Sequence, residues 1–165
     1  MQTRAKVVLA GVLMAGSVMA WKARTPHAVH AADSESQALV VDRIWIDHMP
    51  ETQRDKVQVF VAFAQDRIGV FSQSSQWEGA HELFRFRQDG DALRVVFPQS
   101  DKKESIATAA KHCERDDGMT YCLDLGGSSH GVKHYYSQEG WDLRGVHSEA
   151  EVRTRIQSVV GSLSP

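Results

Sequence analysis

Apolar and polar residues alternate along most of the chain between residues 39 and 137, as in β-strands with one buried face. The clearest run covers residues 56–64, where every second position carries a large apolar side chain. Eight segments show this pattern and are predicted to be strands: 39–48, 56–64, 67–74, 81–88, 92–98, 104–116, 119–125 and 131–137. The first half of 104–116 would also suit a helix, because it is rich in alanine.

The predicted strands are joined by short connections, which favours antiparallel neighbours because parallel crossovers need a dozen or more residues. We therefore expect a mainly β fold, an antiparallel up-and-down meander or barrel of about eight strands. An Asp89-Gly90 pair separates two alternating runs and indicates a two-residue hairpin turn. This turn would place Phe86 opposite Leu93 and Phe84 opposite Val95.

Near the end of the chain, the apolar residues no longer occur at every second position but at helical spacing. Ser148 and Glu151 form a capping-box pattern, in which each side chain satisfies a free backbone N–H group of the first helical turn. The following apolar residues recur at helical spacing and predict one C-terminal amphipathic helix that docks on the sheet or barrel. These residues are Val152, Ile156, Val159, Val160 and Leu163.

The N-terminal segment has the layout of a secretory signal peptide. It begins with Arg4 and Lys6, contains no acidic residue, and continues as an apolar run over residues 7–21, which is short for a bilayer span. Small-residue patterns end at Ala20 and at Ala31, and we favour cleavage after Ala31. The predicted organisation is a signal peptide at 1–31 and a single barrel-like domain at 32–165, although an uncleaved anchor is an alternative.

The net charge of the predicted domain limits the classes of molecule that it could bind. Domain 32–165 holds 15 basic and 21 acidic residues, so it has a formal net charge of -6. An acidic domain lacks the long-range attraction that nucleic acid or an anionic membrane exerts on a basic one. We expect no nucleic-acid partner, no cofactor, and no integral membrane span after processing. A secreted or periplasmic location follows from the signal peptide.

The two cysteines are predicted to form a disulfide. With Asp117-Gly118 as a two-residue turn, Cys113 falls opposite Cys122 at a separation suited to an S–S bond. An exported protein meets oxidising conditions that preserve such bonds. The alternative is a zinc site that adds His130 and His134, but its Cys-x8-Cys spacing is wider than usual, so no metal site is assigned.

The loop with the most enzyme-like composition contains Ser128, Ser129 and His130, between Gly127 and Gly131. Serine beside histidine can form a nucleophile and its base, which would indicate a hydrolase. The alternative is a hairpin loop rich in turn-forming residues. We favour the loop interpretation and assign no catalytic residue.

Eight successive antiparallel strands followed by one helix, over residues 39–163, resemble the lipocalin-like (calycin-type) secreted barrels in element order. The resemblance implies a non-enzymatic barrel that binds a small apolar or amphipathic ligand, or a partner protein. A barrel with a fully packed interior and a structural or interaction role is the remaining alternative. The residues expected to line a ligand cavity are Val57, Val59, Phe63, Phe84, Phe86, Leu93 and Val95.

Overall fold

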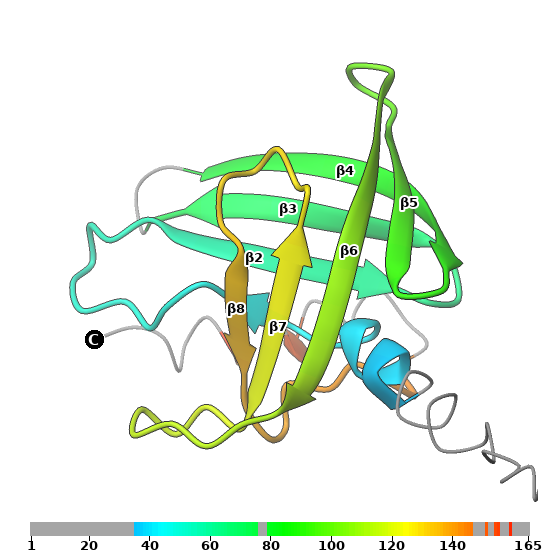
Figure 1. Ribbon diagram of the computed structural model, residues 1–165. Helices are drawn as coiled ribbons and strands as arrows, with labels where there is room; N and C mark the ends of the chain where they lie inside the picture. Colours follow the sequence, from blue (N-terminus) through cyan, green and yellow to red (C-terminus); the bar gives the residue numbers. More distant parts are fainter. Residues whose placement is uncertain (1–34, 76–78, 147–150, 152–153, 156–158, 160–165) are drawn as a thin grey trace, which may run out of the picture.

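Eight antiparallel strands form a closed up-and-down barrel in the computed structural model, which describes residues 35–75, 79–146, 151, 154–155 and 159. Each strand pairs with the next, and β1 also pairs with β8 through Ile46 and Tyr136. Strands β6 to β8 cross β2 to β4 at a steep angle (Figure 1). The strands are β1 (Trp45–Ile46), β2 (Val57–Phe63), β3 (Ile68–Ser74), β4 (Gly79–Asp89), β5 (Ala92–Phe97), β6 (Lys102–His112), β7 (Tyr121–Gly126) and β8 (His134–Ser137).

The predicted fold class is therefore confirmed, with changes at the edges of the elements. The first strand is much shorter than the predicted 39–48, because residues 35–40 are helical and Arg43 forms only an isolated bridge with Asp142. The ambiguous segment 104–116 is a strand through His112. A short helix stands at the start of the described chain, where none was predicted.

The barrel interior is filled with apolar side chains that come from all eight strands and from the residues before β1. Aromatic rings pack on one another within it; the rings of Phe60 and Phe71, for example, have centroids 5.0 Å apart. We call this set the interior cluster. Its buried members are Val40, Val41, Trp45, Phe60, Ala62, Phe71, Phe84, Phe86, Leu93, Val95, Phe97, Ile106, Ala110, Tyr121, Leu123, Leu125 and Tyr135.

A second apolar cluster lies on the outer face of β1, β2 and β8. Trp141, Leu143 and Val159 pack there against these strands, so β2 is covered on both faces. A strand buried on both faces offers no polar row to mark its outer side. We call this set the outer cluster; its buried members are Ile44, Ile46, Val57, Val61, Met119, Trp141, Leu143 and Val159.

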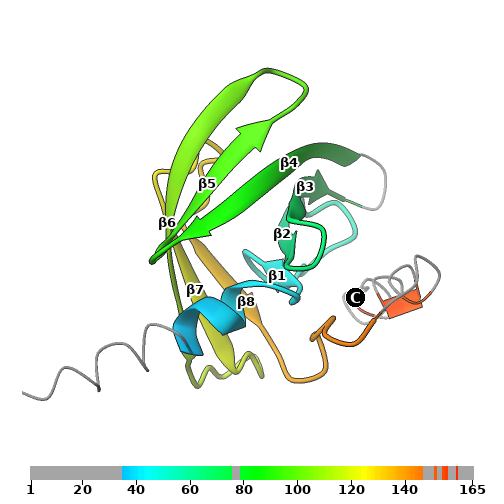
Figure 2. The same ribbon diagram turned by 90° about the vertical axis from the view of Figure 1, so that its right-hand side faces the viewer.

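One end of the barrel is closed by the helix at 35–40. Val40 is fully buried, and its carbonyl accepts a hydrogen bond from the indole N–H of Trp45 at 3.0 Å. The helix lies beside the end of β6 (Figure 2). There the hydroxyl of Ser36 accepts a hydrogen bond from the backbone N–H of Ala110 at 3.0 Å. These contacts tie the chain before β1 to the strands that it covers.

The continuous helix that the structure describes is thus not C-terminal, and it is too short to show a clear amphipathic pattern. Most of the predicted helix at 148–163 lies outside the described residues. Of the stripe expected to dock on the barrel, Val159 is described; it is buried in the outer cluster. In the described part of the chain, no helix has the length and hydrophobicity of a membrane span.

The β4–β5 hairpin has a register two residues away from the predicted one. Phe86 lies opposite Val95, and Leu93 lies opposite Gln88. The two turn residues are Gly90 and Asp91, and of these only Gly90 has a positive φ, 59°. Glycine at the first central position is typical of a type II′ turn, whereas the prediction placed Asp89 first and Gly90 second in the turn. A two-residue shift preserves the side on which each residue points, so the predicted apolar rows still share a face.

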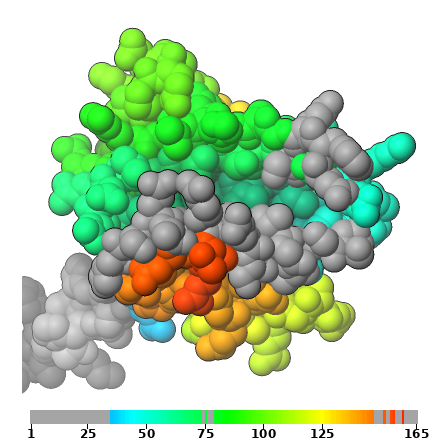
Figure 3. All heavy atoms as spheres, turned by 180° about the vertical axis from the view of Figure 1, so that it is seen from behind, coloured from blue at the N-terminus to red at the C-terminus, as the bar shows by residue number. Residues whose placement is uncertain are grey.

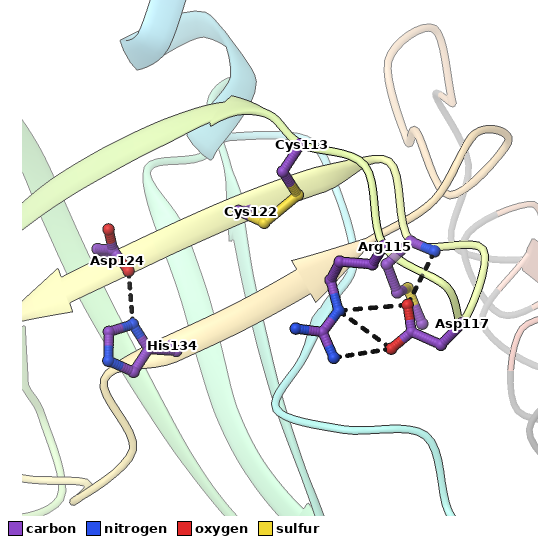
Figure 4. The surroundings of a disulfide bond; sticks show 7 residues. Cys113, Arg115, Asp117, Cys122, Asp124 and His134 are labelled. Carbon is purple, nitrogen blue, oxygen red and sulfur yellow. Dashed lines mark hydrogen bonds and ion pairs between the residues drawn. A yellow bond between two sulfur atoms is a disulfide. The ribbon is translucent and has the colours of Figure 1, made fainter.

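Cys113 and Cys122 form the predicted disulfide, with Cα atoms 5.8 Å apart (Figure 4). The register around it differs from the prediction, because Cys122 lies opposite Lys111 and the backbone N–H of Cys113 bonds to the carbonyl of Thr120. The turn is longer than two residues, and within it Asp117 pairs with Arg115 at 3.0 Å. The disulfide is therefore diagonal across the strands, and it excludes the Cys-His zinc alternative because both thiolates are used.

Removing the disulfide should destabilise the barrel. A Cys113→Ala/Cys122→Ala variant is expected to lose about 2 to 3 kcal/mol of unfolding free energy, because the bond restricts a short loop of the unfolded chain. Denaturant unfolding of both proteins under non-reducing conditions measures the loss. Addition of a reductant should lower the stability of the native chain to that of the variant. A reductant effect of similar size in the variant would contradict this explanation.

Candidate functional site at the barrel mouth

We call the end of the barrel opposite the helix at 35–40 the mouth. Its wall includes the start of β2, the end of β3 and the start of β4, and the loop 127–133 between β7 and β8 reaches over it. A pocket of about 290 Å³ lies there, and a second hollow adjoins it through Gln73 and Ala80. The residues that line the pocket are Gln58, Phe71, Ser72, Gln73, Ala80, His81, Glu82 and His130.

His130 separates the pocket from the aromatic interior. Its ring stacks on Phe71 with centroids 3.9 Å apart and planes 13° apart, and it also lies 5.4 Å from the ring of Phe97. On its other edge, Nε2 lies 3.1 Å from Oε2 of Glu82. The side chain is 18% exposed, so it presents one edge to the pocket while its face extends the interior cluster.

Glu104 holds the loop from the opposite wall of the mouth. Its side chain is 7% exposed and pairs with Lys102 at 2.8 Å. Its second oxygen accepts a hydrogen bond from the backbone N–H of Ser129 at 3.2 Å. Burial acts to raise the pKa of this carboxyl, but the hydrogen bonds from Lys102 and Ser129 outweigh it and hold the pKa below the ordinary value.

The lowered pKa of Glu104 predicts acid sensitivity. Because the pKa is lower in the folded than in the unfolded protein, ionised Glu104 stabilises the fold above the ordinary carboxyl pKa of 4.5. This contribution is lost as the pH falls through the folded-state value. A Glu104→Gln variant should therefore show a weaker loss of thermal stability than the native chain between neutral and acidic pH. Melting temperatures across that range test it, and parallel curves would contradict it.

Gln58 joins the loop to the barrel wall. Its side-chain amide donates to the carbonyl of His130 at 3.3 Å and accepts from the hydroxyl of Tyr135 at 3.2 Å. Burial, with a smaller effect of the charge on Asp47, raises the pKa of Tyr135, so this phenol stays a neutral donor. The loop is therefore fixed by three walls: β2 through Gln58, β4 through Glu82 and β6 through Glu104.

The predicted enzyme-like loop thus belongs to the mouth. The hydroxyl of Ser128 lies 3.4 Å from Nδ1 of His130, and the histidine continues to Glu82, so a serine, a histidine and a carboxylate follow one another. The same hydroxyl accepts a hydrogen bond from the backbone N–H of His130 at 3.2 Å. This second contact is that of a serine turn, in which the hydroxyl shapes its own loop. The arrangement explains the loop geometry without requiring a nucleophile.

The residues predicted to line a cavity separate into two groups. Phe84, Phe86, Leu93 and Val95 lie in the interior cluster. The lining of the described pocket does not include them, and a ligand contact for them stays a prediction. Val57, Val59 and Phe63 belong to or pack against the outer cluster. Placing these three on the inner face of β2 was wrong, because β2 is apolar on both faces and its inward residues are Gln58, Phe60 and Ala62.

Sequence reasoning missed the carboxylates of the mouth. Glu82 lies in the same alternating row as Phe84 and Phe86, and Glu104 in the same row as Ile106. A charged residue at an inward position near a strand end is a signal for a polar barrel mouth. The alternating pattern alone could not show that Glu82 meets the loop at His130 and that Glu104 meets it at Ser129.

The fold and the site together define a closed eight-stranded antiparallel β-barrel with a pocket of polar and aromatic residues at one end. No model of a known protein family, no curated protein and no solved structure matches the chain significantly.

Proposed function

We propose that this protein is a non-enzymatic binding barrel that takes a small amphipathic ligand at its mouth. The observation that carries the proposal is the pocket whose inner side is the stacked Phe71–His130 pair and whose other residues are mainly polar. An apolar part of a ligand would pack on the exposed edges of these rings. Its polar part would meet Glu82 and the glutamine amides, in keeping with the mixed lining of small-molecule sites.

The barrel architecture supports a likeness to lipocalin-type carriers, with one difference in where the ligand sits. Eight strands enclose only enough room for side chains or one small ligand, and here aromatic side chains fill the centre. The ligand would therefore rest at the mouth and not among Phe84, Leu93 and Val95. The disulfide and the proposed signal peptide at 1–31 support a secreted or periplasmic location.

Titration with N-phenyl-1-naphthylamine, a neutral amphipathic fluorophore, tests the proposal. The native chain should show saturable fluorescence enhancement with one site per chain. Ala80→Trp should abolish it, because Ala80 lines the pocket and an indole would occupy the space. Ala109→Trp is the matched control, since Ala109 is exposed on β6 away from the pocket.

Two results would overturn the binding proposal. The first is an absence of saturable uptake by the native chain, and the second is equal uptake by Ala80→Trp. Either result would favour the alternative of a packed structural or interaction domain.

A hydrolase is the second candidate, because Ser128, His130 and Glu82 follow one another in contact. If Ser128 is a nucleophile, a fluorophosphonate probe should label the native chain and the Ser129→Ala variant but not Ser128→Ala. We expect no labelling of the native chain, since the Ser128 hydroxyl accepts the His130 backbone N–H. Labelling that depends on Ser128 would replace the binding proposal with the hydrolase.

A further inference from the structure

The outer surface of β3 to β6 combines basic and apolar side chains in one continuous area. We call it the basic-apolar face. Much of the β4 and β5 surface is in view when the molecule is seen from behind (Figure 3). The side chains that define the face all point away from the interior cluster; they are Ile68, Leu83, Arg85, Arg87, Arg94, Val96 and Lys103.

The strand register alternates the two kinds of side chain. Arg85 lies opposite Ile68 on one side and opposite Val96 on the other. Val96 in turn lies opposite Lys103. A row of apolar, basic, apolar and basic residues therefore crosses four strands, with neighbours about 5 Å apart in the hydrogen-bonding direction. Separated by 17 or more positions in sequence, Ile68, Arg85 and Lys103 become neighbours only through this pairing.

Apolar side chains of the face are exposed to solvent, as its basic side chains are. Ile68 is 41% exposed, Leu83 50% and Val96 37%. In the described part of the chain these are the exposed large apolar side chains, and all three gather on this one face. Single exposed apolar residues are ordinary, but their coincidence on one surface indicates contact with another surface.

The charges of β3 to β6 are sorted between the two sides of the sheet. Glu82 and Glu104 point into the mouth, so Asp89 is the one carboxylate that these described strands place outside, and it pairs with Arg94 at 3.0 Å. Among the residues that the structure describes, no ion pair involves Arg85, Arg87 or Lys103. The face is therefore locally positive although the whole chain has a formal charge of -2.

One pair of like charges within the face destabilises the isolated protein. Arg87 lies directly opposite Arg94 on β5. Like charges at directly opposed positions destabilise a sheet, and the Asp89 carboxylate contacts only one of the two. An anionic surface laid on the face would relieve this repulsion.

We propose that the basic-apolar face docks on an anionic lipid bilayer. The guanidinium and ammonium groups would contact lipid headgroup phosphates, and the interleaved Ile68, Leu83 and Val96 would enter the boundary between headgroups and acyl chains. A soluble polyanion would be attracted by the charges but would leave these apolar side chains without a partner. The net acidity of the chain restricts the contact to this one face.

Vesicle co-sedimentation of the full chain tests the proposal. The chain should bind phosphatidylcholine vesicles containing phosphatidylglycerol more tightly than vesicles of phosphatidylcholine alone, and added salt should weaken the difference. Arg85→Gln/Arg87→Gln should reduce binding to the anionic vesicles on the order of 25-fold, from about fivefold for each basic residue near such a surface. Leu83→Ser should weaken binding without changing the charge.

Lys111→Gln/Lys133→Gln is the matched control, because it removes the same charge from exposed residues outside the face. It should bind anionic vesicles as the native chain does, and all variants should keep the native melting temperature within a few degrees. Because every variant retains the N-terminal segment, any contribution of residues 1–31 is common to all of them. Equal binding by the Arg85/Arg87 variant and the native chain, or an equal loss in the control variant, would overturn the proposal.

Discussion

Gly69→Ala is expected to destabilise the barrel by about 3 kcal/mol, at the upper end of the usual cost of overpacking a core. Gly69 faces inward on β3, directly opposite Phe84 on β4. A Cβ atom there would lie 2.2 and 2.5 Å from two carbons of the Phe84 ring and 2.6 Å from the carbonyl oxygen of Val61. The ring cannot move freely, because it stacks on Phe60 and packs at a tilt against Phe71. Urea denaturation measures the change.

Gly126→Ala is the control for this prediction. Gly126 is also a strand glycine, but a Cβ at its position would meet only the Cβ of Ala107, at an ordinary 3.5 Å. Its stability should remain within about 1 kcal/mol of the native value, since neither overlap nor a positive φ opposes the methyl group. Adding Phe84→Leu to Gly69→Ala should cost less than the sum of the single changes, because both act on the same space. Equal losses in Gly69→Ala and Gly126→Ala would show that the ring contact does not limit the packing.

Arg43→Met should cost about 3 kcal/mol, because it leaves the Gln138 carbonyl and the Asp142 carboxylate without this buried partner. Arg43 is 3% exposed, and its guanidinium lies 3.9 Å from the ring centre of Tyr121. One nitrogen donates to the carbonyl of Gln138 at 3.2 Å, and another lies 3.4 Å from the Asp142 carboxylate. These contacts join the segment before β1 to Tyr121 on β7 and to the chain after β8. Thermal and denaturant unfolding measure the effect.

Arg144, the exposed partner of the Asp142 carboxylate, provides the control for Arg43→Met. Arg144 also pairs with Asp142, but its side chain is 58% exposed. Arg144→Met should therefore cost less than about 1 kcal/mol, as exposed ion pairs do. A loss in Arg144→Met as large as that in Arg43→Met would mean that the charge on Asp142, and not the burial of Arg43, determines the effect.

The number of strands and the fold class could be predicted because alternation is a local property of the sequence. Residues 57–63 and 92–97 show it directly, and the short connections between runs indicate antiparallel neighbours. The disulfide could also be predicted although its register was wrong. Cys113 and Cys122 remain on one face whether they are directly opposite or diagonal, since a shift of two residues does not turn a side chain over.

The tertiary structure decided which face of β2 is inside. Val57, Val59, Val61 and Phe63 form the stronger apolar row, yet they face outward because the segment around Trp141 and Leu143 covers them. The hydrophobicity of a side chain indicates that it is buried, but it does not indicate which part of the protein covers it. The inward row of β2 begins with Gln58, a polar residue that the barrel needs at its mouth.

By itself the sequence determined an eight-stranded antiparallel scaffold, its hairpin-closing disulfide and the loop that contains Ser128 and His130. Only the tertiary structure brought that loop to Gln58, Glu82 and Glu104, which come from three different strands. Likewise, Arg85 and Lys103 share a face only through the pairing of β4, β5 and β6. The reason is physical: alternation and turn residues act over a few positions, whereas the mouth and the basic-apolar face depend on strand register and barrel closure.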